Sequence, residues 1–539
     1  MPKLIIDGKS IEVPAGTTII QAADKLGIDI PRYCYHPALP ISGNCRICLV
    51  EVDQQPKLQI ACHTPVADGM AVKTNSPKVL EARRAVLEFL LVNHPLDCPV
   101  CDQSGECKLQ DYYMEYGQYD SRLSDVKVKK EKKAFPVGPT VMLDQERCIL
   151  CTRCVRFAEG ITKTCEFGVF GRADHSQLDV YPGKKLDNSY SGNVVDICPV
   201  GALTDTDFRF KCRVWYLSKT KSVCPGCSMG CNITVEWDKS RPHGIKPPPM
   251  AGSRPEAGKA RVMRLKPRHN FEVNSYWICD RGRYNYHFID ENRIGHPQFK
   301  GHPTTWDEAI DIIAQAIKPL ADLKATNRIG VLPSASLTNE DLFVIRRFFK
   351  GTLKGAQVDF RVPEKPGDSD AFLIKADKNP NTAGALNILQ ADADTQQIVQ
   401  KAKQGEIDVL YVFGHDLVKL FGKDVVEQIA KKVKLFVFQG SNVNETCGYA
   451  HLNLPSSVYA EKDGTFTNCQ RQVQRIWPAF LPIGEAKDDW EIISLLSAKL
   501  GTLLAYQHAQ DIFKDIAATI APFSEMTYEK IADKGMLLK

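Results

Sequence analysis

Two kinds of sequence feature are missing from this chain of 539 residues. Its best apolar run, residues 85–92, is eight residues long and contains Glu88, whereas a membrane-spanning helix needs about 20 apolar residues. Neither the G-x-G-x-x-G fingerprint nor the G-x-x-x-x-G-K-[ST] phosphate loop occurs anywhere in the sequence. We therefore expect that the chain itself binds no flavin or NAD and that any membrane contact comes through partners.

A strong charge imbalance and a leader segment are also missing. The net charge of +5 is small and spread out, so we expect no nucleic-acid partner, and the basic residues 127–133 are interpreted as a solvated linker. No basic segment followed by an apolar one precedes Asp7, which predicts no signal peptide and an intracellular, reducing location.

Cysteine, in contrast, is abundant and unevenly distributed. The chain has 19 cysteines, and only three of them follow residue 231. An odd number of cysteines in a chain without a secretory signal argues against a disulfide framework. The length suggests several domains. Because most cysteines lie in the first part of the chain, we expect a metal-rich front end joined to an ordinary back end.

The first cysteine group has the spacing Cys34-x10-Cys45-x2-Cys48-x13-Cys62. One cysteine, a close pair and a distant fourth resemble the pattern of plant-type ferredoxins, although the first gap is longer here. Gly43 and Asn44 provide a tight backbone whose amides can approach cluster sulfides. The group predicts a [2Fe-2S] centre, with a structural zinc site as the alternative.

The second group includes a histidine and has the spacing His94-x3-Cys98-x2-Cys101-x5-Cys107. Three cysteines and one histidine suit zinc and a [4Fe-4S] cluster almost equally, so spacing alone leaves both open. Three other groups with cluster-like spacing in the same chain favour a cluster here too. A neutral imidazole in place of one thiolate makes a cluster less negative, which predicts a higher potential at equal burial.

The third group consists of Cys148-x2-Cys151-x2-Cys154 and of Cys198-Pro199, which follows 44 positions later. In two-cluster ferredoxins each such triplet continues with x3-C-P, and that fourth cysteine binds the other cluster. Here Ala158 replaces the first of these fourth cysteines, and Asn188, Ser191 and Val194 stand where a second triplet would be. The pattern predicts a single [4Fe-4S] site in a ferredoxin-like unit, with zinc as a weak alternative.

The fourth group is Cys224-x2-Cys227-x3-Cys231, completed by Cys279. Between them lies a basic, proline-rich stretch at residues 239–269, which we interpret as an exposed loop insertion. The distant fourth ligand makes this spacing less specific than the others. The remaining cysteines have no ligand-spaced companions, and we expect them to be packed core thiols: Cys165, Cys212, Cys447 and Cys469.

Outside the cysteine groups, the spacing of apolar residues predicts different secondary structure at the front and at the back of the chain. At the front, residues 4–6 and 11–13 are predicted strands around a turn at Asp7-Gly8, with a helix starting near Thr18 and another at residues 78–92. At the back, a capping box at residues 305–308 precedes one apolar helix face formed by Ile310, Ile313, Ala314 and Ile317. Apolar runs predict a parallel sheet flanked by helices, with strands at residues 329–332, 409–413 and 435–438.

Together these groups resemble the large iron–sulfur subunit (the G subunit) of respiratory complex I, the proton-pumping NADH:quinone oxidoreductase. The resemblance covers nearly the whole chain, and its most specific parts are GNCRIC at 43–48, the second group, SGNVVDICPVGA at 191–202 and CDRGRY at 279–284. The back end is similar to molybdopterin oxidoreductases at WDEA 306–309, TNE 338–340 and EKDGTFTN 461–468, with Arg471 and Gln474. It is short for that family.

The resemblance implies a multidomain α+β and α/β fold. The implied domains are a [2Fe-2S] ferredoxin-like (β-grasp) domain at 1–78, a [4Fe-4S] domain with one histidine and three cysteine ligands at 79–118, a [4Fe-4S] ferredoxin-type domain at 138–210, a molybdopterin-oxidoreductase-type cluster domain at 217–285 and a degenerate molybdopterin-oxidoreductase-like domain at 295–539. The back domain is a scaffold in this family, so we expect no molybdenum or tungsten pterin.

The resemblance also implies the ligand sets. Cys34, Cys45, Cys48 and Cys62 would hold the [2Fe-2S] cluster. Three [4Fe-4S] clusters would be held by His94, Cys98, Cys101 and Cys107, by Cys148, Cys151, Cys154 and Cys198, and by Cys224, Cys227, Cys231 and Cys279. Only some family members retain the last cluster, which lies off the main electron route.

The implied function is electron relay without a catalytic residue in this chain. A flavoprotein partner would oxidise NADH, and the clusters would pass single electrons towards quinone-facing iron–sulfur partners, coupled in the complex to proton translocation. The implied location is the cytoplasmic face of the bacterial inner membrane, as a peripheral-arm subunit. One alternative is a subunit of a soluble NAD-linked formate dehydrogenase or hydrogenase. An alternative of another class is a zinc-stapled interaction module.

Overall fold

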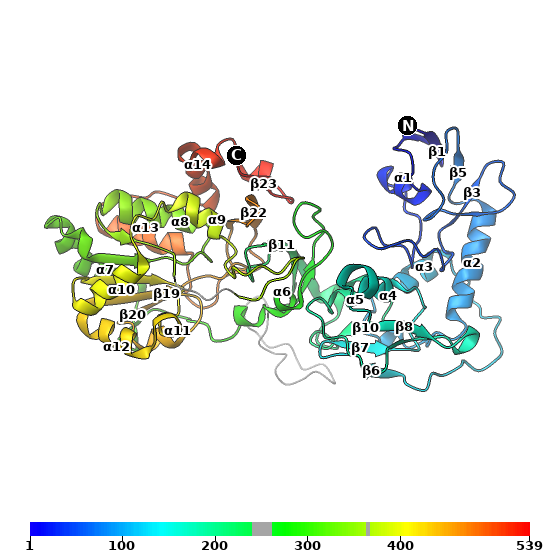
Figure 1. Cartoon of the computed structure of the whole chain (residues 1–539), viewed down its shortest axis with the longest axis horizontal. Helices are drawn as coiled ribbons and strands as arrows, with labels where there is room; N and C mark the ends of the chain where they lie inside the picture. Colours follow the sequence, from blue (N-terminus) through cyan, green and yellow to red (C-terminus); the bar gives the residue numbers. More distant parts are fainter. Residues whose placement is uncertain (240–260, 363–366) are drawn as a thin grey trace. The chain divides into compact units, whose positions relative to one another are not determined.

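The computed structural model describes residues 1–239, 261–362 and 367–539 (Figure 1). The chain divides into two units, with the boundary between Leu217 and Ser218. Within the described ranges, no helix has both the length and the apolar character needed to cross a membrane.

The first unit begins with a five-stranded sheet in the order β2-β1-β5-β3-β4. Its strands are β1 (Lys3–Ile6), β2 (Lys9–Glu12), β3 (Leu49–Val52), β4 (Gln59–Ile60) and β5 (Ala71–Lys73). The predicted turn at Asp7-Gly8 is confirmed, and both residues have a positive φ. Helix α1 (Ile19–Lys25) starts after Thr18, whose N–H donates to the Gln21 side chain, and it buries its apolar face on the sheet. A mixed sheet covered by one helix is the predicted β-grasp.

Two helices follow in the same unit. Helix α2 (Pro77–Leu91) is capped by Ser76 and ends three residues before His94, as the proline at position 95 predicts. Helix α3 (Lys108–Tyr116) starts directly after Cys107. Both helices contribute to a buried cluster that also includes cysteines of the first three groups.

The last part of the first unit has the halves of a ferredoxin. Strands β6 (Ala134–Pro136), β7 (Val141–Asp144) and β10 (Leu203–Asp205) form one sheet, and β8 (Phe167–Phe170) pairs with β9 (Gln177–Val180). The short helix α4 (Arg153–Phe157) includes the end of the cysteine triplet, and α5 (Asn193–Ile197) ends just before Cys198. The triplet thus lies at the start of one helix, and Cys198 lies at the end of the other.

The second unit starts with an antiparallel sheet of β11 (Leu217–Val223), β12 (Asn232–Asp238) and β13 (Val262–Pro267). Helix α6 (Asp280–Tyr284) starts after Cys279. The predicted loop insertion at residues 239–269 falls largely outside the described residues. Its later part was predicted wrongly, because residues 262–267 form β13, where Val262, Met263 and Leu265 are buried against β12.

The back domain contains a seven-stranded sheet in the order β15-β14-β20-β19-β18-β16-β17. Its strands are β14 (Gln298–Phe299), β15 (His302–Pro303), β16 (Ile329–Leu332), β17 (Gln357–Val358), β18 (Val409–Phe413), β19 (Leu435–Gly440) and β20 (Leu452–Pro455). The strands from β17 to β20 are parallel, as predicted. Strand β14 pairs antiparallel with β20, which the apolar runs did not predict.

Helices cover both faces of this sheet. One core contains Val409, Tyr411 and Phe413, and the opposite core contains Leu410 and Val412, since alternate strand residues point to opposite faces. The first core is completed by α7 (Trp306–Asp322), α8 (Asn339–Arg346), α9 (Thr382–Ile388), α13 (Asp489–Lys499) and α14 (Ala509–Thr519). The second is completed by α10 (Thr395–Gln404), α11 (Leu417–Phe421) and α12 (Lys423–Lys432).

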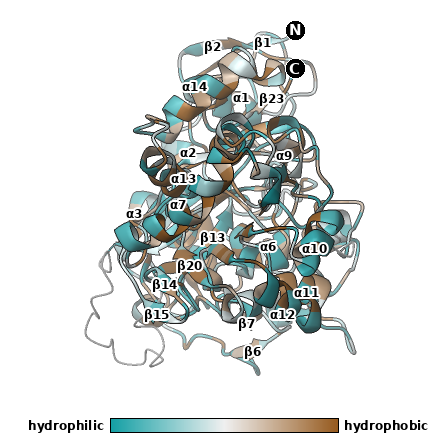
Figure 2. Ribbon diagram, turned by 90° about the vertical axis from the view of Figure 1, so that its left-hand side faces the viewer, coloured by the Kyte–Doolittle hydropathy of each residue, from teal (hydrophilic) through white to brown (hydrophobic). Residues whose placement is uncertain are grey.

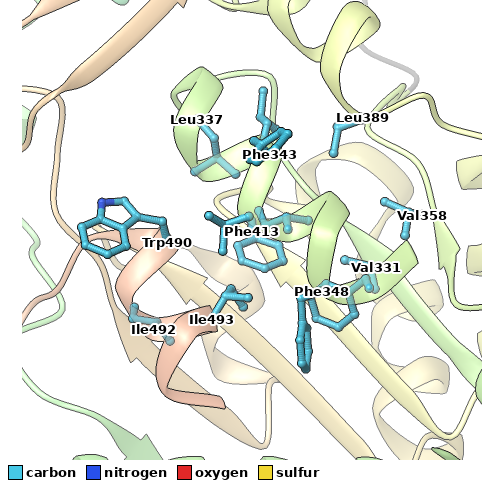
Figure 3. Close-up of a cluster of buried hydrophobic side chains, with 14 of the residues drawn as sticks. Val331, Leu337, Phe343, Phe348, Val358, Leu389, Phe413, Trp490, Ile492 and Ile493 are labelled. Carbon is cyan, nitrogen blue, oxygen red and sulfur yellow. The ribbon is translucent and has the colours of Figure 1, made fainter. Parts of the chain in front are cut away.

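The figures show how these cores are built. In Figure 1, α8 and α13 lie on one side of β19, and α11 and α12 lie on the other. Helices α10 and α12 carry both hydrophilic and hydrophobic residues in Figure 2, as helices with one covered face do. Figure 3 shows Phe343, Phe413 and Ile493 gathered in the first core. The predicted capping box at Thr305 is confirmed, because its hydroxyl accepts from the Glu308 N–H.

A small sheet and a short helix complete the domain. The sheet consists of β21 (Gly464–Thr467), β22 (Gln472–Ile476) and β23 (Met536–Leu537), and the helix is α15 (Tyr528–Ile531). Strand β21 lies inside the motif shared with molybdopterin oxidoreductases, and all four of its residues are buried.

Candidate iron–sulfur sites

The four cysteines of the first group converge beside the β-grasp sheet. Cys34 and Cys45 come from the loop between α1 and β3, Cys48 directly precedes β3, and Cys62 follows β4. Hydrogen bonds join the Cys34 side chain to those of Cys45 and Cys62, and the Cys48 side chain to Cys62. This sharing of protons lowers the pKa of Cys34 and of Cys48, and it raises the pKa of Cys45 and of Cys62.

The loop around Cys45 directs backbone amides at these sulfurs. Gly43 and Arg46 have φ values of 67° and 60°, in the left-handed region. The N–H groups of Asn44 and Cys45 approach the Cys34 sulfur, and the Cys34 N–H donates to Cys45 Sγ at 3.4 Å. Gly43 and Asn44 predicted such amides, which stabilise negative charge on thiolates and on a bound cluster.

The sulfurs of the second group also share one neighbourhood. Cys107 is the residue before α3, so the Leu109 and Gln110 N–H groups at the start of that helix point to its sulfur. Burial raises the pKa of Cys107 to about 11 and also raises that of Cys101, and both lie within electrostatic range of Cys98, which is exposed.

His94 fits the role of fourth ligand in this group. Burial lowers the pKa of His94 to about 4, so its ring is neutral at pH 7. Its Nδ1 atom is buried and has no hydrogen-bond partner among the described residues. His94 and Cys101 both interact with Asp97 and Arg147, which places them in the same region. A neutral imidazole with an unused nitrogen is the form that binds a metal.

The third group lines one small cavity. All four of its cysteines contribute to the wall, together with apolar residues that include Val169 and Leu178. Leu150 and Thr152 have φ values of 53° and 58°, and the Leu150 N–H donates to Cys148 Sγ at 3.4 Å. The N–H groups of Val200, Ala202 and Leu203 approach the Cys198 sulfur.

The thiols in this cavity resist losing their protons to water. Burial raises the pKa of all four cysteines, to about 11 for Cys151, and the neighbouring sulfurs raise the pKa of Cys148, Cys151 and Cys154 further. A metal centre that binds thiolates and releases their protons would remove this cost.

The fourth group lies in the second unit. Cys224, Cys227 and Cys231 lie between β11 and β12, and Cys279 caps α6 by accepting from the Gly282 N–H at 3.3 Å. Each of the four cysteines is less than 9% exposed. Burial raises the pKa of Cys224, Cys231 and Cys279, and all four sulfurs lie within electrostatic range of one another.

Family models match most of the chain. They are described as 2Fe-2S iron-sulfur cluster binding domain (residues 3–77), NADH-ubiquinone oxidoreductase-G iron-sulfur binding region (83–122), NADH-quinone oxidoreductase subunit 3, ferredoxin-like domain (138–204), Molybdopterin oxidoreductase Fe4S4 domain (217–291) and Molybdopterin oxidoreductase (375–499). Each cysteine group falls inside one of the first four matches.

Whole-chain relatives agree with these matches. The G subunit of NADH-quinone oxidoreductase from Rickettsia bellii is 40% identical, over 100% of this chain and 93% of that protein. The mitochondrial NADH-ubiquinone oxidoreductase 78 kDa subunit of Neurospora crassa is 44% identical, over 96% of this chain and 83% of that protein. The chain belongs to the G-subunit family of NADH-quinone oxidoreductase. It is an iron–sulfur electron-transfer subunit, as the resemblance in the sequence implied.

A solved structure of a NAD+-reducing [NiFe]-hydrogenase is also similar to part of this G-subunit protein. It is 30% identical, and the match covers 40% of this chain and 91% of the hydrogenase chain, with a TM-score of 0.36.

The donor sets of this G-subunit protein fit iron–sulfur clusters. Thiolates and a neutral imidazole are the ligands that such clusters use, and backbone N–H groups surround the sulfurs. Within the described ranges, no three His, Cys, Asp or Glu side chains are grouped closely enough to hold a single metal ion.

The residues that support the loop of the fourth group were not predicted from the sequence. The Asn468 side chain donates to the Met229 carbonyl at 3.1 Å, and the Gln474 side chain donates to the Gly230 carbonyl at 3.0 Å. The Cys469 N–H donates to the Ser228 carbonyl at 2.7 Å. Asn468 and Gln474 belong to the molybdopterin-like motif, but nothing in the sequence indicates that they contact residues more than 200 positions away.

The four cysteines outside the ligand groups do not behave alike. Cys212 is buried as predicted, and Cys447 is half-buried against the second core of the back domain. The prediction was wrong for Cys165 and Cys469, which are both exposed. Cys165 has a left-handed φ of 51° in the segment before β8, and Cys469 lies in the turn between β21 and β22, so neither side chain enters a core.

Proposed function

We propose that this G-subunit protein holds four clusters, one [2Fe-2S] and three [4Fe-4S]. The [2Fe-2S] cluster would bind to Cys34, Cys45, Cys48 and Cys62. The [4Fe-4S] clusters would bind to His94, Cys98, Cys101 and Cys107, to Cys148, Cys151, Cys154 and Cys198, and to Cys224, Cys227, Cys231 and Cys279. The observation that carries the proposal is the cavity walled by all four cysteines of the third group.

When bound, each cluster would accept and release one electron at a time. The chain's own residues would set how readily this happens. Buried sulfurs disfavour added negative charge, whereas the amides near Cys34, Cys107 and Cys198 favour it. His94 contributes no charge to the second cluster, which is expected to raise its potential relative to an all-thiolate cluster at equal burial.

The proposed partners would supply the steps for which the sequence shows no site. We propose that a flavoprotein subunit oxidises NADH and delivers electrons to this chain, and that quinone-facing iron–sulfur subunits receive them. The complex would lie on the cytoplasmic face of the bacterial inner membrane, with this chain in its peripheral arm. The domain boundaries proposed are 1–78, 79–118, 138–210, 217–285 and 295–539.

We further propose that the back domain binds no molybdenum or tungsten pterin. The motif residues that resemble active relatives are engaged in protein contacts. Glu461 accepts from Arg261 at 2.6 Å and from Arg293 at 2.7 Å, and Glu340 accepts from Thr465 and Tyr528. Neither Cys447 nor Cys469 lies between residues 340 and 409, where the family pattern places a metal ligand. Molybdenum or tungsten near one atom per chain would contradict this proposal.

Metal analysis and electron paramagnetic resonance (EPR) test the cluster count. Protein purified with its partners should contain about 14 iron atoms per chain, matching acid-labile sulfide and little zinc. Roughly ten irons would remove one [4Fe-4S] cluster from the proposal. Near-stoichiometric zinc would instead assign the second group to a structural metal. Copurification with a formate dehydrogenase or hydrogenase, and not with quinone-reducing subunits, would favour the alternative function.

A further inference from the structure

Arg153 lies between the ligand loops of the first and third groups. It is the first residue of α4, between Cys151 and Cys154. Its Nη1 donates to the Ile197 carbonyl at 2.9 Å, and its Nη2 donates to the Tyr35 carbonyl at 2.5 Å. Each of these carbonyls belongs to the residue next to a cysteine ligand, Cys198 in the third group and Cys34 in the first.

Arg156 makes the same connection one turn further along α4. Its Nη2 donates to the Cys34 carbonyl at 2.6 Å and to the Cys151 carbonyl at 3.1 Å. A single nitrogen thus joins the backbones of two predicted ligands from different groups. Asn44 adds a third link, because its side chain donates to the Leu150 carbonyl at 3.0 Å.

Neither guanidinium has a carboxylate partner within the described parts of the chain. The Nε atom of Arg153 is buried and also has no hydrogen-bond partner there. Arg147, beside the second group, differs because it pairs with Asp97 at 2.6 Å and with Asp144 at 3.4 Å.

A cation withdrawn from water needs a counter-charge nearby. The cysteine sulfurs within electrostatic range of Arg153 come from both groups: Cys151, Cys198, Cys34 and Cys45. Both arginines also lie within electrostatic range of the Cys151 sulfur. The negative charge that matches these cations is therefore the charge of the two sulfur groups.

We propose that Arg153 and Arg156 form a positive bridge between the first and third clusters. The bridge fixes the two ligand loops to each other, and, on the cluster assignment proposed above, it offsets negative charge on both clusters. Reduction adds an electron to a cluster, so a cation nearby favours the reduced form. One bridge shared by two clusters raises both potentials and weakens the repulsion between two reduced neighbours.

The test compares Arg153→Gln with Arg153→Lys in the assembled complex, using EPR-monitored redox titration of each cluster. Glutamine keeps an amide donor but removes the charge, whereas lysine keeps the charge. For Arg153→Gln we expect the reduction equilibrium constants of the first and third clusters to fall about tenfold, or about 59 mV for a one-electron couple. Arg153→Lys should restore most of this loss, and the second cluster should not change in either variant.

Arg213→Gln is the matched control. This guanidinium donates to the Cys101 carbonyl at 2.6 Å, so the substitution removes a similar contact at the second group. The first and third potentials should stay at their parental values in this variant.

Several results would overturn the bridge. Equal shifts in potential for Arg153→Gln and Arg153→Lys would show that the role of Arg153 is purely structural. A shift in the potential of one cluster alone would show that the two clusters do not share its charge. If Arg153→Gln does not assemble, Arg156→Gln replaces it: lowered potentials of both clusters support the bridge, and unchanged potentials overturn it. Absence of the two EPR signals from the parental protein would overturn the cluster assignment itself, and the charge offset with it.

Discussion

The ferredoxin-like front unit and the back domain differ in the partners that their buried polar groups find. In the front unit, one buried cluster includes cysteines from three groups, among them Cys34, Cys107 and Cys151. In the back domain, the buried charges are matched by protein partners. Lys462 contacts Asp341 at 2.9 Å and Asp489 at 2.6 Å, and Glu461 is held by two arginines.

The difference indicates what each part needs in order to fold. On the proposed cluster assignment, bound iron would be the partner of the front unit's buried thiols and of the His94 nitrogen. The back domain can be satisfied by its own side chains and by its two apolar cores. Four sets of substitutions can break or sharpen this comparison.

The largest effect is expected from comparing one cysteine in each unit. Cys151→Ala removes a proposed ligand from the buried cluster that the front groups share, on the proposed electron route. We expect the electron-transfer rate of any surviving complex to fall more than about 100-fold, since even changes around ligands cost about 10–100-fold. Cys227→Ala should instead reduce assembly and leave the rate of the surviving complex largely unchanged, because its cluster is proposed to be a side branch.

Rates are measured as NADH:quinone turnover per assembled complex, with assembly measured by gel filtration. Equal losses of rate in the two variants would remove the distinction between main route and side branch.

A buried ion network should make the back domain sensitive to one lysine. Burial lowers the pKa of Lys462, but Asp341 and Asp489 raise it above its usual range, so the side chain stays charged. Lys462→Met leaves two buried carboxylates without their cation, and we expect a loss of about 3–5 kcal/mol in the unfolding free energy of the back domain. Hydrogen exchange of residues 301–539 measures this loss.

Lys431→Met is the matched control, since Lys431 pairs with Glu427 at an exposed helix position. It should change the stability by less than about 1 kcal/mol. If both variants lost the same stability, the buried network would have no special role.

A buried histidine should make the same domain sensitive to acid. His415 is 5% exposed, and its Nε2 lies 3.1 Å from the Pro333 carbonyl. Burial lowers the pKa of His415 to about 4, below its value of about 6.5 in the unfolded chain, so the unfolded state binds more protons between these values. Stability is therefore lost as the pH falls from about 6.5 to 4, by about 3 kcal/mol in total.

Thermal unfolding of His415→Gln across this pH range should show less of the acid-dependent loss than the parental protein shows. His302→Gln, an exposed change in the same domain, should keep the parental pH dependence. An acid-dependent loss that is the same in His415→Gln and in the parental protein would assign that loss to other groups.

The smallest effect concerns the support of the fourth group. Gln474→Ala removes the hydrogen bond to the Gly230 carbonyl, which is worth about 1 kcal/mol. We expect the EPR signal of the fourth cluster to be lost at a lower temperature, with the other three signals unchanged. Gln470→Ala, an exposed change in the adjacent turn, is the control. Loss of all four signals together would show general destabilisation.

Local patterns in the sequence were enough to predict many elements. Strands β16, β18 and β19 are short apolar runs, and α7 is indicated by its capping box, because these signals depend only on near neighbours in the chain. Strand β14 has two residues and is held between β15 and β20, so no local pattern could predict it. Strand β13 was missed for a similar reason, since its apolar residues stand beside a basic, proline-rich stretch.

The sequence by itself determined which residue types can bind a metal and how they are grouped, because ligand spacing is a property of the chain. It also determined the family, through motifs that extend over nearly the whole length. Only the tertiary structure decided that Arg153 and Arg156 join residues near Cys34 to residues near Cys198, and that Asn468 and Gln474 hold the loop of the fourth group. These contacts join residues that are far apart in the sequence, and the free energy that selects them comes from burying charges and polar groups together, which no local pattern records.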